Sequence, residues 1–149
     1  MKIHAAVTSE GFPLSIVIGS GAEYDPYKFE ETIGAIKVRT GHRPITRPEE
    51  IVADSIYDDA QVREYLRRRR IKTSIPENKR NRKKRKRGRP RRFSKQSYAK
   101  RSAVERFFSR IKTGFRRIII RYERLDKIFR ALVIIATFFI YWEKLQEKL

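Results

Sequence analysis

Residues 97–114, SYAKRSAVERFFSRIKTG, combine two side-chain patterns that a single helix satisfies at once. The large apolar residues recur at intervals of one, three and four positions and share one helical face: Val104, Phe107, Phe108 and Ile111. A second set, spaced by three, four and seven positions, shares nearly one other face: Tyr98, Arg101, Glu105 and Lys112. The segment therefore predicts a helix with an apolar face for packing and a polar face available for binding.

The polar face has two interpretations that spacing alone leaves open. In one, it is a solvated surface with an ion pair between Arg101 and Glu105 at positions i and i+4. An Arg that precedes its Glu is the weaker orientation for such a pair, so ion pairing is a poor reason for the pattern. In the other, the face presents a carboxylate between a phenol and two cations for chemistry.

Upstream of this helix, a second carboxylate follows a short apolar segment. Ile51-Val52-Ala53 predicts a buried strand, and Asp54 stands at its carboxyl end, before a predicted helix. Open α/β sheets bind ligands at this place. A helix cap or a turn is the alternative role for Asp54, and its position alone does not decide between them.

The remaining segments alternate between strand and helix patterns. Segments 3–7 and 14–18 predict a hairpin, and 71–75 predicts a further strand. Asp25-Pro26 predicts the start of a helix that runs to Gly41, and Asp58 or Asp59 predicts the cap of a helix that ends near Arg70. A final helix from Arg124 has this predicted core stripe: Ile128, Leu132, Ile135, Phe139 and Trp142. We also expect Phe138 in the core.

This order predicts an α/β (α+β) fold, in which a mixed sheet is flanked by helices. The longest apolar stretch, 131–142, is shorter than the ~20 residues needed to cross a bilayer, so we expect no membrane partner. The sequence has no Cys, which excludes disulfides and thiolate metal sites.

Charge points to a polyanionic partner. The 149 residues carry a formal net charge of +20, and all of the excess lies after residue 60, because residues 1–60 hold 6 basic and 10 acidic residues. Within 79–92, 11 of 14 residues are Lys or Arg. Such a surplus favours nucleic acid, since neutralising phosphates releases counterions. We expect a basic loop at 78–97 that is extended or disordered in isolation.

Several blocks together resemble the DDE-type insertion-sequence transposases, which have an RNase H-like catalytic domain. The spacing of Tyr98, Arg101, Glu105 and Lys112 is similar to that family's signature. Residues 104–112, VERFFSRIK, and 52–58, VADSIYD, look like its third and second carboxylate segments. Lys2-Ile3-His4 at the start of a hairpin and Ile75-Pro76 before a basic loop also fit, so the resemblance spans almost all of residues 1–149.

The resemblance implies DNA transposition by Mg²⁺-dependent strand cleavage and strand transfer, with Mn²⁺ as an alternative ion. It assigns Asp54 and Glu105 as metal ligands, and it implies contacts to transposon ends and target DNA. The residues expected at DNA are Tyr98, Arg101, Lys112, Arg106, Arg82, Lys83, Lys84, Arg85, Lys86 and Arg87. A cytoplasmic, nucleoid-associated location in a prokaryote follows from the same resemblance.

One departure from the family pattern concerns its first carboxylate. That residue lies on a strand before the hairpin that here opens at Lys2, so we expect an N-terminally truncated domain that lacks the first strand. We expect no cleavage by this chain alone, and association with an upstream transposase segment or a second protomer. The alternative is a non-enzymatic, basic nucleic-acid-binding protein, a remnant of a transposase, which explains the charge but not the two carboxylate segments.

Overall fold

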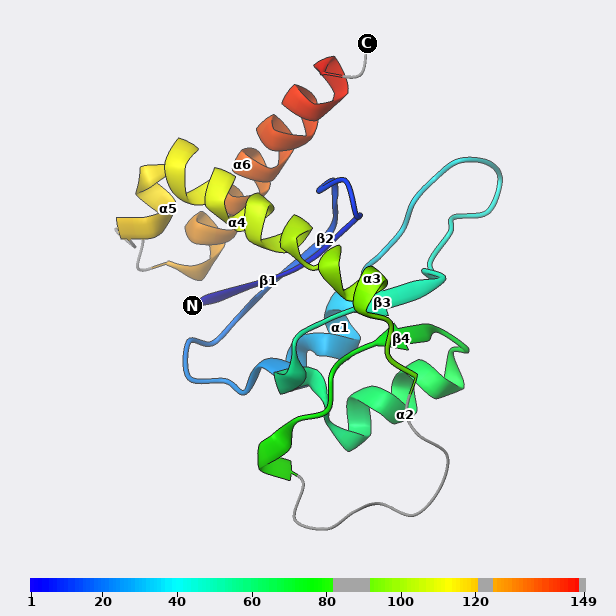
Figure 1. Cartoon of the computed structure of the whole chain (residues 1–149). Coiled ribbons are helices and arrows are strands. Elements are labelled where there is room, and N and C mark those ends of the chain that lie inside the picture. Colours follow the sequence, from blue (N-terminus) through cyan, green and yellow to red (C-terminus); the bar gives the residue numbers. More distant parts are fainter. Residues whose placement is uncertain (82–91, 121–124, 148–149) are drawn as a thin grey trace.

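The computed structural model describes residues 1–81, 92–120 and 125–147, and its helices pack around two small sheets (Figure 1). The strands are β1 (Lys2–Val7), β2 (Pro13–Gly19), β3 (Glu50–Val52) and β4 (Lys72–Ser74). The α-helices are α1 (Phe29–Gly34), α2 (Ala60–Arg68), α3 (Lys95–Ala99), α4 (Ser102–Gly114), α5 (Arg116–Ile120) and α6 (Asp126–Gln146). Three short 3₁₀ helices are η1 (Asp25–Lys28), η2 (Ser55–Tyr57) and η3 (Lys79–Asn81).

The predicted hairpin is confirmed. β1 and β2 are antiparallel, with Lys2 opposite Gly19 and an irregularity in the register after Ala6. Gly11 closes the turn at a φ of +88°, a backbone conformation that glycine adopts without a steric penalty, and its N–H donates to the carbonyl of Thr8 at 2.9 Å.

The second sheet is a parallel pair. β3 and β4 are joined through α2, as a parallel connection requires a crossover. Asp59 caps α2 by accepting a hydrogen bond of 2.8 Å from the N–H of Gln61, which confirms one of the two predicted caps. The strand predicted before Asp54 is confirmed as β3.

The prediction of one mixed sheet is wrong for the part of the chain that the structure describes. β1 pairs with β2 and β3 pairs with β4, but no hydrogen bonds connect the two pairs. The resulting fold is a mixed α/β arrangement with two separate two-stranded sheets. A cavity lined by β1 and β3 lies between the two sheets.

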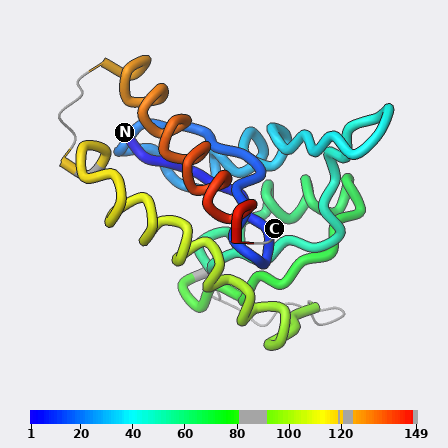
Figure 2. The backbone as a smooth tube through the Cα atoms, turned by 90° about the horizontal axis from the view of Figure 1, so that it is seen from above, coloured from blue at the N-terminus to red at the C-terminus, as the bar shows by residue number. Residues whose placement is uncertain are grey.

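Two hydrophobic cores lie on opposite faces of the hairpin. Because side chains alternate along a strand, Ile3 and Ala5 pack on the core formed with α4, α5 and α6, whereas Ala6 packs on the core formed with α1 and α2. Figure 2 shows α6 lying across the hairpin with α4 alongside it. The hairpin is therefore a middle layer between two sets of helices.

The helix predicted from Asp25 differs at both ends. Its first turn is the 3₁₀ helix η1, its N-cap is Tyr24 without a side-chain bond, and Asp25 instead pairs with Lys2 at 3.0 Å. α1 ends at Gly34 rather than Gly41. The prediction that Pro26 begins a helix is confirmed. Asp25 does not cap that helix, because its carboxylate pairs with Lys2 instead.

The predicted core stripe of the last helix is wrong by one position. Its buried residues are Phe129, Val133, Ala136 and Ile140. Four of the predicted stripe residues are exposed by 42–52 %, namely Ile128, Ile135, Phe139 and Trp142, and Phe138 is also exposed. Because α6 is apolar nearly all round, its periodicity does not determine which side packs.

The helix predicted from Ser97 is divided into α3 and α4, and the separate helix α5 follows. The structure describes the ends of the predicted basic loop as η3 and α3, and residues 82–91 lie outside the described residues. Among the described helices, none is long and apolar enough to cross a membrane.

Candidate functional site

Arg101 connects the two carboxylates that the sequence singled out. Its guanidinium lies 2.7 Å from an Oε of Glu105 and 3.9 Å from an Oδ of Asp54. The Arg side chain is 32 % exposed, and the two acidic side chains are 55 % and 57 % exposed. The fold thus brings together a strand end and a helix face that are far apart in sequence, at a site that solvent reaches.

Asp54 has a local role as well. It is the N-cap of η2, and its Oδ1 accepts a hydrogen bond of 2.6 Å from the N–H of Ser55. The other oxygen, Oδ2, is the one nearest Arg101. The predicted capping role of Asp54 is therefore confirmed, and the cap uses one carboxylate oxygen while the other faces Arg101.

The junction between α3 and α4 positions Arg101. The N–H of Arg101 donates to the carbonyl of Tyr98, and that of Val104 donates to the carbonyl of Arg101, in the tighter 3₁₀ pattern. This turn brings the Arg101 guanidinium to 5.6 Å from the centre of the Tyr98 ring. The ring of Phe93 packs on Tyr98 at 5.4 Å, although Phe93 is 41 % exposed rather than in the core.

A cavity of about 880 Å³ opens beside these residues, between the two sheets. Asp54, Arg101 and Lys112 line it, together with the apolar side chains of α1 and α4. Lys112 on α4 is exposed to solvent at the border of the same cavity as Arg101. Three of the predicted site residues are therefore gathered around one opening.

A phenol and a further ion pair lie near Asp54, and sequence reasoning did not find them. Burial, together with the charges of Asp25 and Asp54, raises the pKa of Tyr57 to about 12. Asp25 accepts a hydrogen bond from Lys2 Nζ at 3.0 Å. Asp25, Lys2 and Tyr57 all line the cavity. One indication of this group is visible in the sequence, namely that Tyr57 lies three residues after Asp54.

The other predicted DNA contacts are in different places. Arg106 is exposed at the turn of the hairpin, where it donates to Ser102 Oγ at 2.7 Å and to the carbonyl of Ser9 at 3.4 Å. The structure therefore places it apart from Asp54, on the side of α4 that meets the hairpin. Six predicted contacts lie outside the described residues: Arg82, Lys83, Lys84, Arg85, Lys86 and Arg87.

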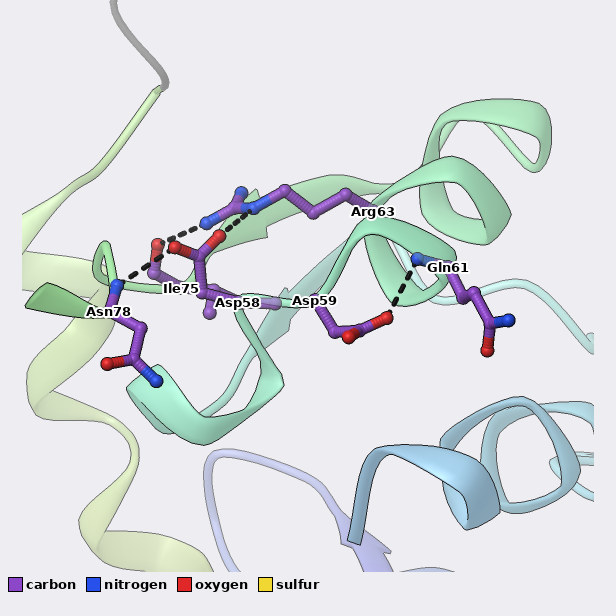
Figure 3. A network of polar contacts seen from close by, with 6 residues as sticks. All are labelled: Asp58, Asp59, Gln61, Arg63, Ile75 and Asn78. Atoms are coloured by element: carbon purple, nitrogen blue, oxygen red, sulfur yellow. Dashed lines mark hydrogen bonds and ion pairs between the residues drawn. The ribbon is translucent and has the colours of Figure 1, made fainter. Parts of the chain in front are cut away.

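A buried carboxylate holds the segment that leads into those basic residues (Figure 3). Asp58 accepts hydrogen bonds from Arg63 Nε at 2.5 Å and from the N–H of Asn78 at 2.9 Å. Arg63 in turn donates to the carbonyl of Ile75 at 3.0 Å. Further along, the N–H of Ser94 donates to the buried hydroxyl of Ser74 at 3.2 Å. Both ends of the basic segment are thus attached beside β4.

The oxygen donors at the site fit a hard divalent cation in part. Among the described residues there is no group of three His, Cys, Asp or Glu side chains that could hold an ion. Asp54 and Glu105 form a pair of carboxylates, and Mg²⁺ keeps several waters and needs one or two protein carboxylates. In this structure the guanidinium of Arg101 provides the positive charge beside the two carboxylates.

Comparison with known proteins identifies one family. A family model described as "Transposase DDE domain" matches residues 1–141, which include both sheets and most of α6. Neither the curated proteins nor the solved structures contain a match to this chain.

Proposed function

Since the chain belongs to the transposase DDE domain family, we propose that it acts in DNA transposition through a divalent-metal site at Asp54 and Glu105. The observation that supports this proposal is that the Arg101 guanidinium lies within 4 Å of both carboxylates, at 3.9 Å from Asp54 and 2.7 Å from Glu105. Two carboxylates that lie close together repel each other unless a cation lies between them. Arg101 supplies that positive charge in this structure, and a metal ion would supply it in the proposed site.

Mg²⁺ is the ion that we assign to this pair, with Mn²⁺ as a substitute. Carboxylate oxygens are the hard ligands that Mg²⁺ prefers. When bound, the ion would polarise a phosphodiester and lower the pKa of a coordinated water. The protein's own contribution is orientation: the Ser55 N–H holds one oxygen of Asp54, and the first turn of α4 carries Glu105.

We assign the DNA contacts nearest the carboxylates to Tyr98, Arg101 and Lys112. Arg101 offers a planar guanidinium for a phosphate once a metal ion neutralises the two carboxylates, and Lys112 offers a point charge. The Tyr98 ring, which now stacks against Arg101, provides a surface for a base. We also assign Arg106 and residues 82–87 as phosphate contacts, which carry no sequence information.

Calorimetric titration with Mn²⁺ tests the metal site directly. We expect Asp54→Asn and Glu105→Gln each to weaken binding by about tenfold or more, because each removes one of two charged ligands. Glu64→Gln is a matched control, since Glu64 is an exposed helical carboxylate that pairs with Arg67. Equal Mn²⁺ binding by all four proteins, wild type included, would rule out the assignment.

DNA binding at several salt concentrations tests the second half of the proposal. Lys112→Ala and Arg106→Ala should each reduce the salt dependence by about one counterion. A chain that only coats nucleic acid would bind DNA as well or better without Glu105, and Mg²⁺ would only weaken its binding as a competing counterion. A metal-dependent site instead predicts tighter binding of Glu105-containing protein when Mg²⁺ is present.

A further inference from the structure

The exposed side of α6 is a large apolar surface. Figure 1 shows this helix at the upper edge of the molecule, and its buried residues pack in the core beside the hairpin. Eight large apolar side chains of the helix are each exposed by 39–61 %, namely Ile128, Ile134, Ile135, Phe138, Phe139, Tyr141, Trp142 and Leu145. With about half of a roughly 200 Å² side chain exposed at each position, they present roughly 800 Å². The largest apolar patch on a typical monomer is roughly 300–600 Å², so this surface indicates an interaction site.

The spacing of the exposed residues indicates what kind of element the surface binds. Six exposed positions follow one another in alternating steps of three and four residues, and we call them the α6 seam: Ile128, Ala131, Ile135, Phe138, Trp142 and Leu145. An average step of 3.5 residues is the period of a helix that packs along a second helix over its whole length. The surface therefore fits another helix better than it fits a strand or a small molecule.

The chemistry on both sides of the seam is apolar as well. The positions that flank it are Leu132, Ile134, Phe139 and Tyr141, so neither the seam nor its flanks contain a charged residue between Ile128 and Leu145. Lys144 is directed away from the seam, since its Nζ donates to the carbonyl of Glu10 in the hairpin turn at 2.8 Å. A helix that covers the seam must therefore be apolar along the same length, and α6 itself meets this requirement.

The seam is complementary to its own copy when the two helices run in opposite directions. In an antiparallel pair centred between Ile135 and Phe138, these two residues lie opposite each other, and Ile128 lies opposite Leu145 of the second copy. The same register places Ala131, the smallest seam residue, opposite Trp142, the largest. Large residues that face small ones interdigitate, so every layer of this pair is filled to a similar extent.

Two aromatic rings already form the ridge that this register requires. The rings of Phe138 and Trp142 stack with their centres 6.4 Å apart. In the antiparallel register this ridge meets Ala131 and Ile135 of the second copy, where the short alanine side chain leaves room for the indole. A parallel pair would instead place Trp142 against Trp142 and Ala131 against Ala131, which gives one overfilled and one empty layer.

We propose that two copies of this chain associate through the α6 seam as an antiparallel pair of helices about a two-fold axis. The roughly 800 Å² that each copy offers equals what one partner buries in a standard stable interface. This inference goes beyond the proposed function, because it involves neither the carboxylates nor DNA. Each seam residue faces solvent in the single chain, so substitutions there should leave the unfolding of the dilute monomer nearly unchanged.

Sedimentation equilibrium of the whole chain in EDTA, after nuclease treatment, tests the association. We expect a reversible monomer–dimer equilibrium for the wild type. Phe138→Glu should weaken it at least about a hundredfold, because two-fold symmetry introduces the unpaired charge twice and each copy costs about tenfold or more. Ile45→Glu is the matched control, since Ile45 is an apolar residue of similar exposure, 52 %, outside α6. Its dimerisation should equal that of the wild type.

Cross-linking tests the orientation, because the sequence has no Cys and single engineered cysteines are therefore specific. Positions 128 and 145 lie about 25 Å apart along one helix. A short bismaleimide should join Ile128→Cys protein to Leu145→Cys protein when the two are mixed, and it should join neither variant to itself. Self-joining of each variant, without joining between them, would indicate a parallel pair and overturn the proposal.

Two further outcomes would also overturn it. One is a wild-type chain that stays monomeric at every concentration, including the case in which it binds phospholipid vesicles through α6 instead. The other is equal dimerisation of Phe138→Glu and wild type, which would place the interface elsewhere. Glu105→Gln should dimerise as the wild type does, so failure of the metal site and failure of the helix pair are distinguishable.

Discussion

The guanidinium of Arg101 lies 3.9 Å from the carboxylate of Asp54, although the two residues belong to separate segments of the sequence. The same guanidinium also pairs with Glu105 at 2.7 Å, so one cation serves two acidic groups. An arginine in this position compensates the repulsion between the carboxylates and competes with any metal ion for them. In the metal site that we propose, binding of the ion would therefore be coupled to the orientation of Arg101.

Replacement of Arg101 separates these two effects. Arg101→Gln should tighten Mn²⁺ binding, because the competing positive charge is gone, and weaken DNA binding, because a phosphate contact is lost. Calorimetry and a DNA salt titration measure the two effects. Arg110→Gln is the control, since Arg110 pairs with Glu147 on an exposed surface. Weaker Mn²⁺ binding by Arg101→Gln would contradict competition.

Loss of the buried carboxylate in Figure 3 should reduce stability. Asp58→Ala leaves the guanidinium of Arg63, only 16 % exposed, without its acidic partner and leaves the N–H of Asn78 without an acceptor. Breaking a buried pair in this way costs about 3 kcal/mol. Urea unfolding measures it, with Glu64→Ala as an exposed ion-pair control that should cost under about 1 kcal/mol. Similar losses in both variants would argue against the network.

The corrected packing of α6 gives a matched pair of substitutions. Ile140 is 2 % exposed and Ile135 is 50 % exposed on the same helix. Ile140→Ala should lower the free energy of unfolding by about 2–5 kcal/mol, because it leaves a cavity, whereas Ile135→Ala should cost less than about 1 kcal/mol. Chemical denaturation distinguishes them, and the reverse order would restore the stripe predicted from the sequence.

His4 should make the protein sensitive to mild acid. Burial lowers the pKa of His4 below 6.5, and the charges of Asp25 and Glu23 offset this only partly. The unfolded chain then binds a proton more readily than the folded chain, so stability falls as pH falls below about 6.5 and is unaffected above it. Nε2 of His4 is also buried without a hydrogen-bond partner among the described residues.

His4→Val removes both the proton site and the unpaired nitrogen. The variant should be at least as stable as the wild type at pH 7.5 and should lose less stability between pH 6.5 and 5. Thermal unfolding across this pH range measures the difference. His42→Asn is the control, because His42 is exposed, and its curve should follow that of the wild type. Parallel curves for His4→Val and wild type would contradict a role for His4.

The relation of Arg101, Glu105 and Lys112 along α4 could be read from residue spacing, because a helix repeats at a constant angle, whereas Tyr98 lies on the separate helix α3. The strand before Asp54 and the cap at Asp59 could be read from local patterns for the same reason. The pairing of Arg101 with Asp54 could not, since no local rule states which strand end a helix will meet. Nor could the packing side of α6, whose apolar residues surround the helix.

Residue patterns alone were therefore sufficient to predict most of the elements, the surplus of positive charge and the two candidate acidic residues. Those properties depend on neighbours within a few positions along the chain or on composition. Three further relations became visible in the folded chain: Arg101 lies beside both carboxylates, the described strands form two sheets instead of one, and a cavity lies between β1 and β3. These relations depend on how the two cores pack the hairpin between them, and packing is set by contacts between residues distant in sequence.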